Sequence, residues 1–288
     1  MTRDELIAWC GHFWIPKERR SGCEAWNAGV SCAVLAAGNS AFVPEPIRGN
    51  PLNKDIIFLA VNPGGGKTPA AQDELDSCPW WDRSGNKPGG DWATVLGSQE
   101  DFAGFHLGSN ERAASDETER HIGYARDRVS TGAAYILAAV GNPQENSIPI
   151  RLHIDSMWFS KYIGDVALLN MAHCKSPGWT VDKSKAVADL CAPKTMALLH
   201  DLKPRALVCL GVPAWELLVQ LAKSCCCLTE SSTERLWHLR WHGGGVTGLV
   251  KSPHPTILSY ADRADVVDAI KAALSLRTSG SSQTTVTP

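Results

Sequence analysis

The 288-residue sequence lacks an excess of either charge, since 28 Lys and Arg against 30 Asp and Glu give a formal net charge of −2. This balance excludes a uniformly basic protein that coats nucleic acid, although it leaves room for a local basic face. The sequence also lacks an apolar run of the roughly 18 residues that a membrane span requires. The stretch 133–140 is among its longest apolar runs. We therefore expect no membrane contact.

We also expect neither a secretion signal nor a disulfide framework. Asp4 and Glu5 stand near the N-terminus, where a signal peptide would carry an apolar segment. Ten cysteines are many, but three of them are consecutive at 225–227, a spacing that suits disulfide pairing poorly. The sequence therefore indicates a reducing, cytoplasmic setting in which the thiols are buried, bound to a metal or incidental.

Apolar runs and helical periodicity alternate along the chain. Strands are predicted at 55–61, 165–170, 205–210 and, more weakly, 246–251. Helices are predicted at 3–10, 126–140, 182–202 (stepped at Pro193), 213–223 and 261–276. This alternation predicts an α/β fold with three layers, α/β/α, around a short central parallel sheet of about four strands. We expect a single domain at 1–276 and a disordered Ser/Thr-rich tail at 277–288.

Polar side chains follow three of these strands. Asn62 follows the first strand in Ala-Val-Asn-Pro-Gly, Asn170 ends the second in Leu-Leu-Asn, and His254 follows the fourth in Pro-His-Pro. Because parallel strands end at one edge of a sheet, two amides and one imidazole are predicted at the edge where α/β folds bind ligands.

The glycine-rich segment 62–68 also permits a phosphate-loop interpretation. A Walker A loop needs glycine five residues before its Gly-Lys pair, and that position is Val61 here. Pro63 moreover removes a backbone donor that would cradle a phosphate. Nucleotide binding and a turn without chemistry therefore stay as the minor alternatives at this segment.

Taken together, these motifs resemble the uracil-DNA glycosylase superfamily. The Asn-Pro-Gly segment that begins at Asn62 resembles the first motif of the mismatch-specific and single-strand-selective types. Residues 165 to about 218 resemble the iron–sulfur, thermophile-type enzymes, and His254 matches the histidine of the third motif. The resemblance implies a DNA glycosylase of base excision repair that hydrolyses the N-glycosidic bond of uracil or a related deaminated base.

The resemblance also implies roles for individual residues. Asn62 would position the attacking water, and His254 would donate a hydrogen bond to the departing base, where negative charge develops. Asn170 would read the pyrimidine edge, a task that suits an amide because it both donates and accepts hydrogen bonds. Trp80 would stack on the base, and Gly64 would let the DNA backbone approach closely. Without this context, an asparagine at a strand end such as Asn170 is more often a turn residue.

Further residues are candidates for DNA contact. A base inside a duplex must be flipped out to reach such a site, and Leu258 matches the family's wedge that fills the gap. The alternative is a leucine packed beneath its loop. Lys251, Arg263 and the aromatic and basic segment 235–242 are candidates for a DNA-facing patch, and the alternative is an amphipathic segment with two core tryptophans.

Cys174 and Cys191 stand where the iron–sulfur enzymes carry two cluster ligands. With Cys10 and Cys23 they would supply the four thiolates of a structural [4Fe–4S] centre. The close N-terminal cysteine pair of that family is absent here, so free thiols stay as the alternative. We expect a monomer whose partner is uracil-containing DNA, single- or double-stranded. A catalytically silent DNA-binding protein of the same fold is the second hypothesis.

Overall fold

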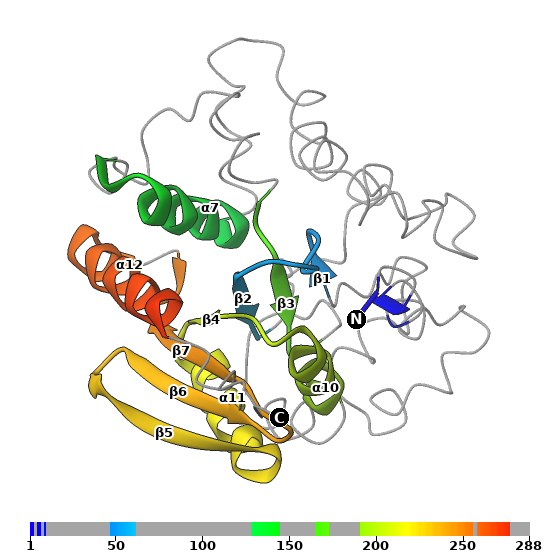
Figure 1. Cartoon of the computed structure of the whole chain (residues 1–288). Coiled ribbons are helices and arrows are strands. Elements are labelled where there is room, and N and C mark those ends of the chain that lie inside the picture. The colour runs from blue at the N-terminus through cyan, green and yellow to red at the C-terminus, as the bar shows by residue number, and fades with distance from the viewer. Residues whose placement is uncertain are drawn as a thin grey trace, which may run out of the picture.

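The described strands form one seven-stranded sheet in the order β1-β3-β2-β4-β7-β6-β5 (Figure 1). The computed structural model describes residues 1–2, 5–6, 9, 47–61, 128–144, 165–172, 191–255 and 258–276. Within these ranges, no helix is long and apolar enough to cross a membrane.

Four neighbouring strands make up the parallel centre of the sheet. They are β3 (Leu168–Asn170), β2 (Ile56–Ala60), β4 (Ala206–Leu210) and β7 (Val246–Ser252). Each lies within or close to one of the four predicted apolar runs, so the predicted parallel sheet is confirmed. The apolar runs are continuous because both faces of a central parallel sheet are covered.

Three antiparallel strands extend this centre on both sides. The short β1 (Ile47–Arg48) pairs with β3. On the other side, β6 (Leu236–Trp241) pairs with β7, and β5 (Cys226–Thr233) pairs with β6. The sequence did not predict these strands. The segment 235–242 therefore belongs mainly to a sheet hairpin, in which Trp241 is buried and its indole N–H donates to the Thr247 hydroxyl at 2.8 Å.

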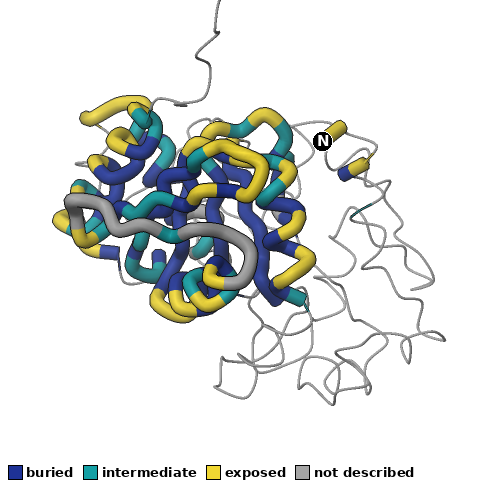
Figure 2. The backbone as a smooth tube through the Cα atoms, turned by 60° about the horizontal axis from the view of Figure 1, so that its bottom comes forward, coloured by how far each residue is buried: buried dark blue, intermediate teal, exposed yellow. Residues whose placement is uncertain are grey.

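Among the described residues, four helices cover the two faces of the sheet, as the three-layer α/β fold requires. Helices α7 (Arg128–Gly141) and α12 (Tyr260–Ser275) pack on one face together with Phe58, Val208 and Val250. On the other face, α10 (Ala192–Leu202) and α11 (Val212–Cys225) pack on the alternate strand residues. The tube in Figure 2 accordingly shows buried strands between helices whose outer sides are exposed.

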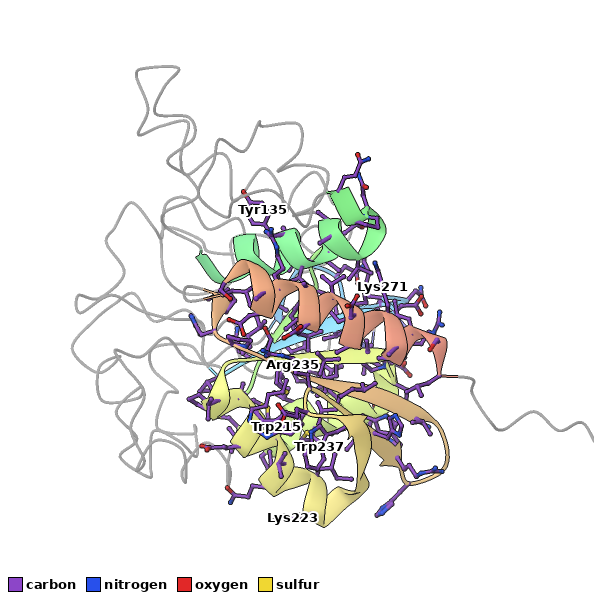
Figure 3. All side chains as sticks on the ribbon, turned by 90° about the vertical axis from the view of Figure 1, so that its left-hand side faces the viewer. Tyr135, Trp215, Lys223, Arg235, Trp237 and Lys271 are labelled. Atoms are coloured by element: carbon purple, nitrogen blue, oxygen red, sulfur yellow. The ribbon has the colours of Figure 1, made fainter. Side chains whose placement is uncertain are left out.

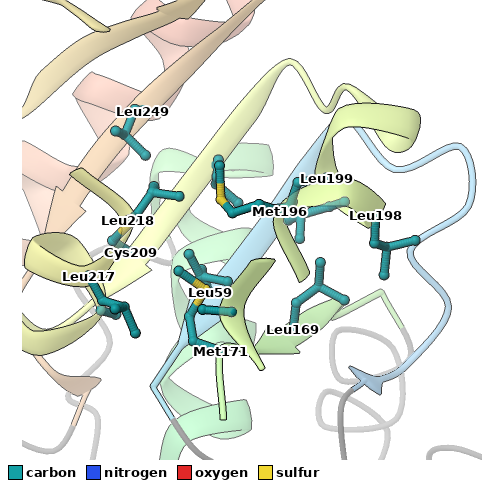
Figure 4. Packing of buried hydrophobic residues seen from close by; sticks show 14 of the residues in the cluster. Leu59, Leu169, Met171, Met196, Leu198, Leu199, Cys209, Leu217, Leu218 and Leu249 are labelled. Atoms are coloured by element: carbon teal, nitrogen blue, oxygen red, sulfur yellow. The ribbon is translucent and has the colours of Figure 1, made fainter. Parts of the chain in front are cut away.

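Within the described parts of the chain, the α10/α11 face holds the larger of two apolar clusters (Figure 4). Leu59, Leu169 and Leu249 of three strands lie in it with Leu199 and Leu218 of the two helices. Burying each leucine stabilises the fold by about 1.5–3 kcal/mol. Cys209 lies in the same cluster, and burial raises the pKa of its thiol, so this cysteine packs as an apolar residue.

Local signals set where the helices begin. The Thr2 hydroxyl accepts a hydrogen bond from the Glu5 amide at 3.2 Å, as expected for a helix cap. Ser259 caps α12 by accepting from the Asp262 amide at 3.1 Å. Pro193 lies in the first turn of α10, where its missing N–H leaves no helical hydrogen bond unmade. The predicted residues 182–190 of this helix lie outside the described residues.

Candidate active site

The strand order creates a switch point at the carboxyl edge of the parallel strands. From β2 the chain passes to β3 on one side by way of α7, and then to β4 on the other side by way of α10. The two crossovers lie on opposite faces of the sheet. In doubly wound folds, ligands bind outside the carboxyl ends of the strands at such a point, which here lies between β2 and β4.

Asn170 lies on one side of this point, at the end of β3. Its pairing partner is Ala60, the last residue of β2, and the Asn170 side chain is fully buried. The Met171 amide donates to the Ala60 carbonyl at 3.0 Å, and the Ala172 amide donates to the Val61 carbonyl at 2.6 Å. Asn170 is therefore held in a segment that stays paired with the chain leaving β2.

His254 lies on the other side, in the loop between β7 and α12. The Gly211 amide, just after β4, donates to the Ser252 carbonyl at 2.9 Å, so the loop begins in register with the end of β4. A Cβ atom placed on Gly211 would lie 3.5 Å from Cβ and 3.6 Å from Cδ2 of His254. The imidazole therefore lies against the end of β4. Gly211 has a φ of 94°, which favours glycine.

The electrostatic state of His254 follows from its half-buried position. Burial disfavours the charged imidazolium and lowers the pKa of His254 below its ordinary value. At neutral pH the ring is therefore neutral, with one nitrogen that donates a hydrogen bond and one that accepts.

Asn170 and His254 thus flank the end of β2 at one edge of the sheet. β3 and β4 are the two neighbours of β2, so their axes are separated by two strand spacings, or roughly 10 Å. Asn62 is the next residue in the chain after Val61, which follows β2. Asn62, Gly64 and Trp80 themselves lie outside the described residues.

Leu258, the predicted wedge, is buried. Leu258 is only 7% exposed and packs in the α7/α12 cluster with Val266 and Ile270. This position corresponds to the alternative in which the leucine packs beneath its loop. Leu258 would have to leave the core in order to enter a base stack.

Lys251 lies near the same edge, on the α11 face of the sheet. Its ammonium group is 5.7 Å from the centroid of the Trp215 ring. Trp215 in turn meets the ring of Trp237 (Figure 3), edge-on and with 5.4 Å between the ring centroids. Lys251 is half-buried, which leaves part of its side chain accessible to a ligand. Trp215 is buried, and its ring faces the ammonium group of Lys251 in a cation–π contact.

Among the described arginines of the predicted DNA-facing patch, one is corrected. Arg263 is fully buried, with its guanidinium 5.7 Å from the centroid of the Tyr135 ring, so it is not a surface cation. Arg235 is ion-paired with Asp262 at 2.7 Å and with Asp265 at 3.4 Å, which offsets its charge locally. Lys251 is therefore a better candidate for a phosphate contact than either arginine.

The predicted cluster ligands are described at one position only. Cys191 is half-buried immediately before α10, whereas Cys209 is fully buried in the core. Cys10, Cys23 and Cys174 lie outside the described residues. Among the described residues, no group of three or more His, Cys, Asp or Glu side chains is placed to hold a metal ion.

The comparisons with known proteins add no relative. No protein-family model matches the chain, and no curated protein sequence matches it significantly. Function is therefore inferred from the residues at the carboxyl edge of the parallel strands.

Proposed function

We propose that this protein is a DNA glycosylase that hydrolyses the N-glycosidic bond of uracil or a related deaminated base in DNA. The observation that carries the proposal is the position of Asn170 and His254 on either side of the end of β2, at the edge where ligands bind. Asn62 follows Val61 in the chain and completes the motif order that resembles the superfamily.

The proposed reaction uses the neutral form of His254. The bond between the sugar carbon and the base nitrogen breaks with its electron pair going to the base, and an oxocarbenium-like sugar remains. The imidazole N–H of His254 donates to the pyrimidine O2, where the negative charge collects. Water oriented by Asn62 adds to the sugar carbon and releases a proton, and the departed base takes up a proton from solvent.

Recognition of the base is assigned to Asn170. Its amide supplies both a donor and an acceptor, which match the carbonyl and the imide N–H of uracil. The base must leave a duplex or already be single-stranded to reach this edge. Lys251 is the proposed contact to the DNA backbone. We further propose that the protein acts as a monomer in the cytoplasm.

Excision from a uracil-containing oligonucleotide tests this function directly. Alkali converts each abasic site into a strand break, so scission reports base release. His254→Ala should lower the single-turnover rate on the order of 10²–10³-fold, since the lost donor acts mainly in the transition state. DNA affinity should change little. His242→Ala is the matched control, because His242 is exposed at the opposite edge of the sheet.

Binding measurements made beside this assay separate the alternatives. Tight binding of uracil-containing DNA without release of free uracil would favour the catalytically silent DNA-binding protein. Binding of magnesium nucleotide, with no effect of uracil-containing DNA, would favour the phosphate-loop interpretation of residues 62–68. Normal excision by His254→Ala would contradict the assignment of His254.

A further inference from the structure

Helix α7 carries a glycine, Gly132, inside its first half, in the sequence Thr-Gly-Ala-Ala-Tyr. Glycine destabilises a helix interior relative to alanine, because it loses more conformational freedom on folding. The neighbouring Ala133 and Ala134 show that small helix-forming residues suit this surface. A glycine at position 132 therefore points to a close approach by another part of the chain.

The approaching residue is Pro255, which directly follows His254. A Cβ atom placed on Gly132 would overlap the Cβ of Pro255 and would lie 3.2 Å from its Cγ and 3.3 Å from its Cα. Both Gly132 and Pro255 are buried. The proline ring therefore packs directly onto the backbone of α7. The contact is so close that a methyl group on residue 132 would not fit.

The loop that carries His254 and Pro255 thus lies between two glycines, one in a helix and one at the end of a strand. Pro255 packs against Gly132 of α7, while His254 packs against Gly211 at the end of β4. Proline also restricts the backbone of the residue that precedes it, which here is His254 itself. The position of the imidazole is therefore coupled to α7 through a single residue.

We infer that Gly132 is a positioning residue for His254, acting through its contact with Pro255. This inference depends on the proposed function for its kinetic test, but the contact can also be tested without activity. A displaced loop would move the imidazole away from the departing base, and a misplacement of about 1 Å can lower a rate on the order of 10²-fold.

The kinetic test compares two glycine-to-alanine variants in the same helix. Gly132→Ala should reduce the single-turnover excision rate about 10- to 100-fold, with DNA affinity changed much less, because the loop moves while the DNA contacts stay. Gly141→Ala is the matched control, since a Cβ atom at Gly141 would meet nothing within 4 Å. An equal loss in both variants, or none in Gly132→Ala, would overturn the inference.

A double-mutant cycle identifies the partner. Pro255→Gly removes the ring atoms that the new methyl group would meet. Gly132→Ala should therefore lower the single-turnover excision rate by a several-fold smaller factor in the Pro255→Gly background than in the wild-type protein. If Gly132→Ala does not fold, the double variant should still fold. An unchanged factor, or a double variant that also fails to fold, would show that Pro255 is not the residue concerned.

An NMR measurement keeps the inference separate from the proposed function. The ring signals of His254, identified by their loss in His254→Asn, should shift in Gly132→Ala, whereas those of His238 and His242 should not. If the wild-type protein excised no uracil, this shift would still show the positioning contact, and only the function would fail. Unmoved His254 signals in a folded Gly132→Ala protein would reject the contact.

Discussion

The hydroxyl of Thr195 donates a hydrogen bond to the backbone carbonyl of Asn170 at 2.9 Å, and both side chains are fully buried. Thr195 lies in the first turn of α10, and Asn170 ends β3. The bond therefore joins a helix on one face of the sheet to the residue proposed to read the base.

Thr195→Val should show the contribution of this bond. Valine keeps the shape of threonine but leaves the buried carbonyl without this donor, which should lower the free energy of unfolding by about 1–3 kcal/mol. Urea denaturation measures the change. Thr195→Ser, which retains a hydroxyl group, should lose less. Equal stability of the valine variant and the wild-type protein would show that the bond does not stabilise the fold.

The stability of the protein should depend on the protonation of His254. Because burial lowers the pKa of His254 in the folded state, the unfolded chain takes up this proton first as the pH falls. The contribution of neutral His254 to the free energy of unfolding is fully present above the ordinary histidine pKa of about 6.5. It is lost as the pH falls through the lowered pKa of the folded state.

Denaturation of the wild-type protein and His254→Asn at pH 7 and pH 5 tests this dependence. The wild-type protein should lose more stability than the variant over this interval. The other titrating groups are common to both proteins, so the difference isolates His254. An identical loss would indicate that His254 titrates in the folded state as it does in the unfolded chain.

Leu258→Ala should act on the fold, because Leu258 is buried in the α7/α12 cluster. Truncating a buried leucine typically lowers the free energy of unfolding by about 2–5 kcal/mol. Excision from single-stranded and duplex substrates should fall by the same factor. A loss confined to well-paired duplex would instead support the wedge role that the sequence motif suggests, and would require the loop to open on DNA.

The iron–sulfur prediction is testable through Cys191. Anaerobically purified protein should be brown and contain about four irons, the number in the proposed centre. Cys191→Ser should reduce the iron content and the visible absorbance. Cys209→Ser is the control for a buried thiol that is not a proposed ligand. A colourless, iron-free wild-type protein that is still folded would exclude the centre.

The parallel centre of the sheet was predictable because its strands are continuous apolar runs such as Ile56–Ala60 and Ala206–Leu210. The hairpin of β5 and β6 was not. Its sequence mixes residues such as His238 and Arg240 with tryptophans, a pattern that suits both an exposed segment and a partly covered antiparallel strand. Pairing with β7 decides between these structures, and that pairing is a tertiary contact.

The sequence predicted Asn170 and His254 at one edge of the sheet, because Asn170 ends a parallel strand and His254 closely follows another. It could not indicate the role of Gly132 or the burial of Leu258, since both depend on how the loop after β7 packs against α7 and α12. A glycine within a helical pattern is a signal for close packing, but the pattern alone does not name the residue that approaches.

The hairpin has a consequence for self-association. Without β5 and β6, the strand β7 would become an edge, and its residues Leu249 and Val250 would border a row of unpaired backbone groups. Such an edge is a template for strands of other molecules. With the hairpin in place, β7 is paired on both sides, with β4 and with β6, and β5 is the outermost of the described strands on this side. The same hairpin that pairs with the strand leading to His254 thus removes that strand from the edge of the sheet, where another molecule could pair with it.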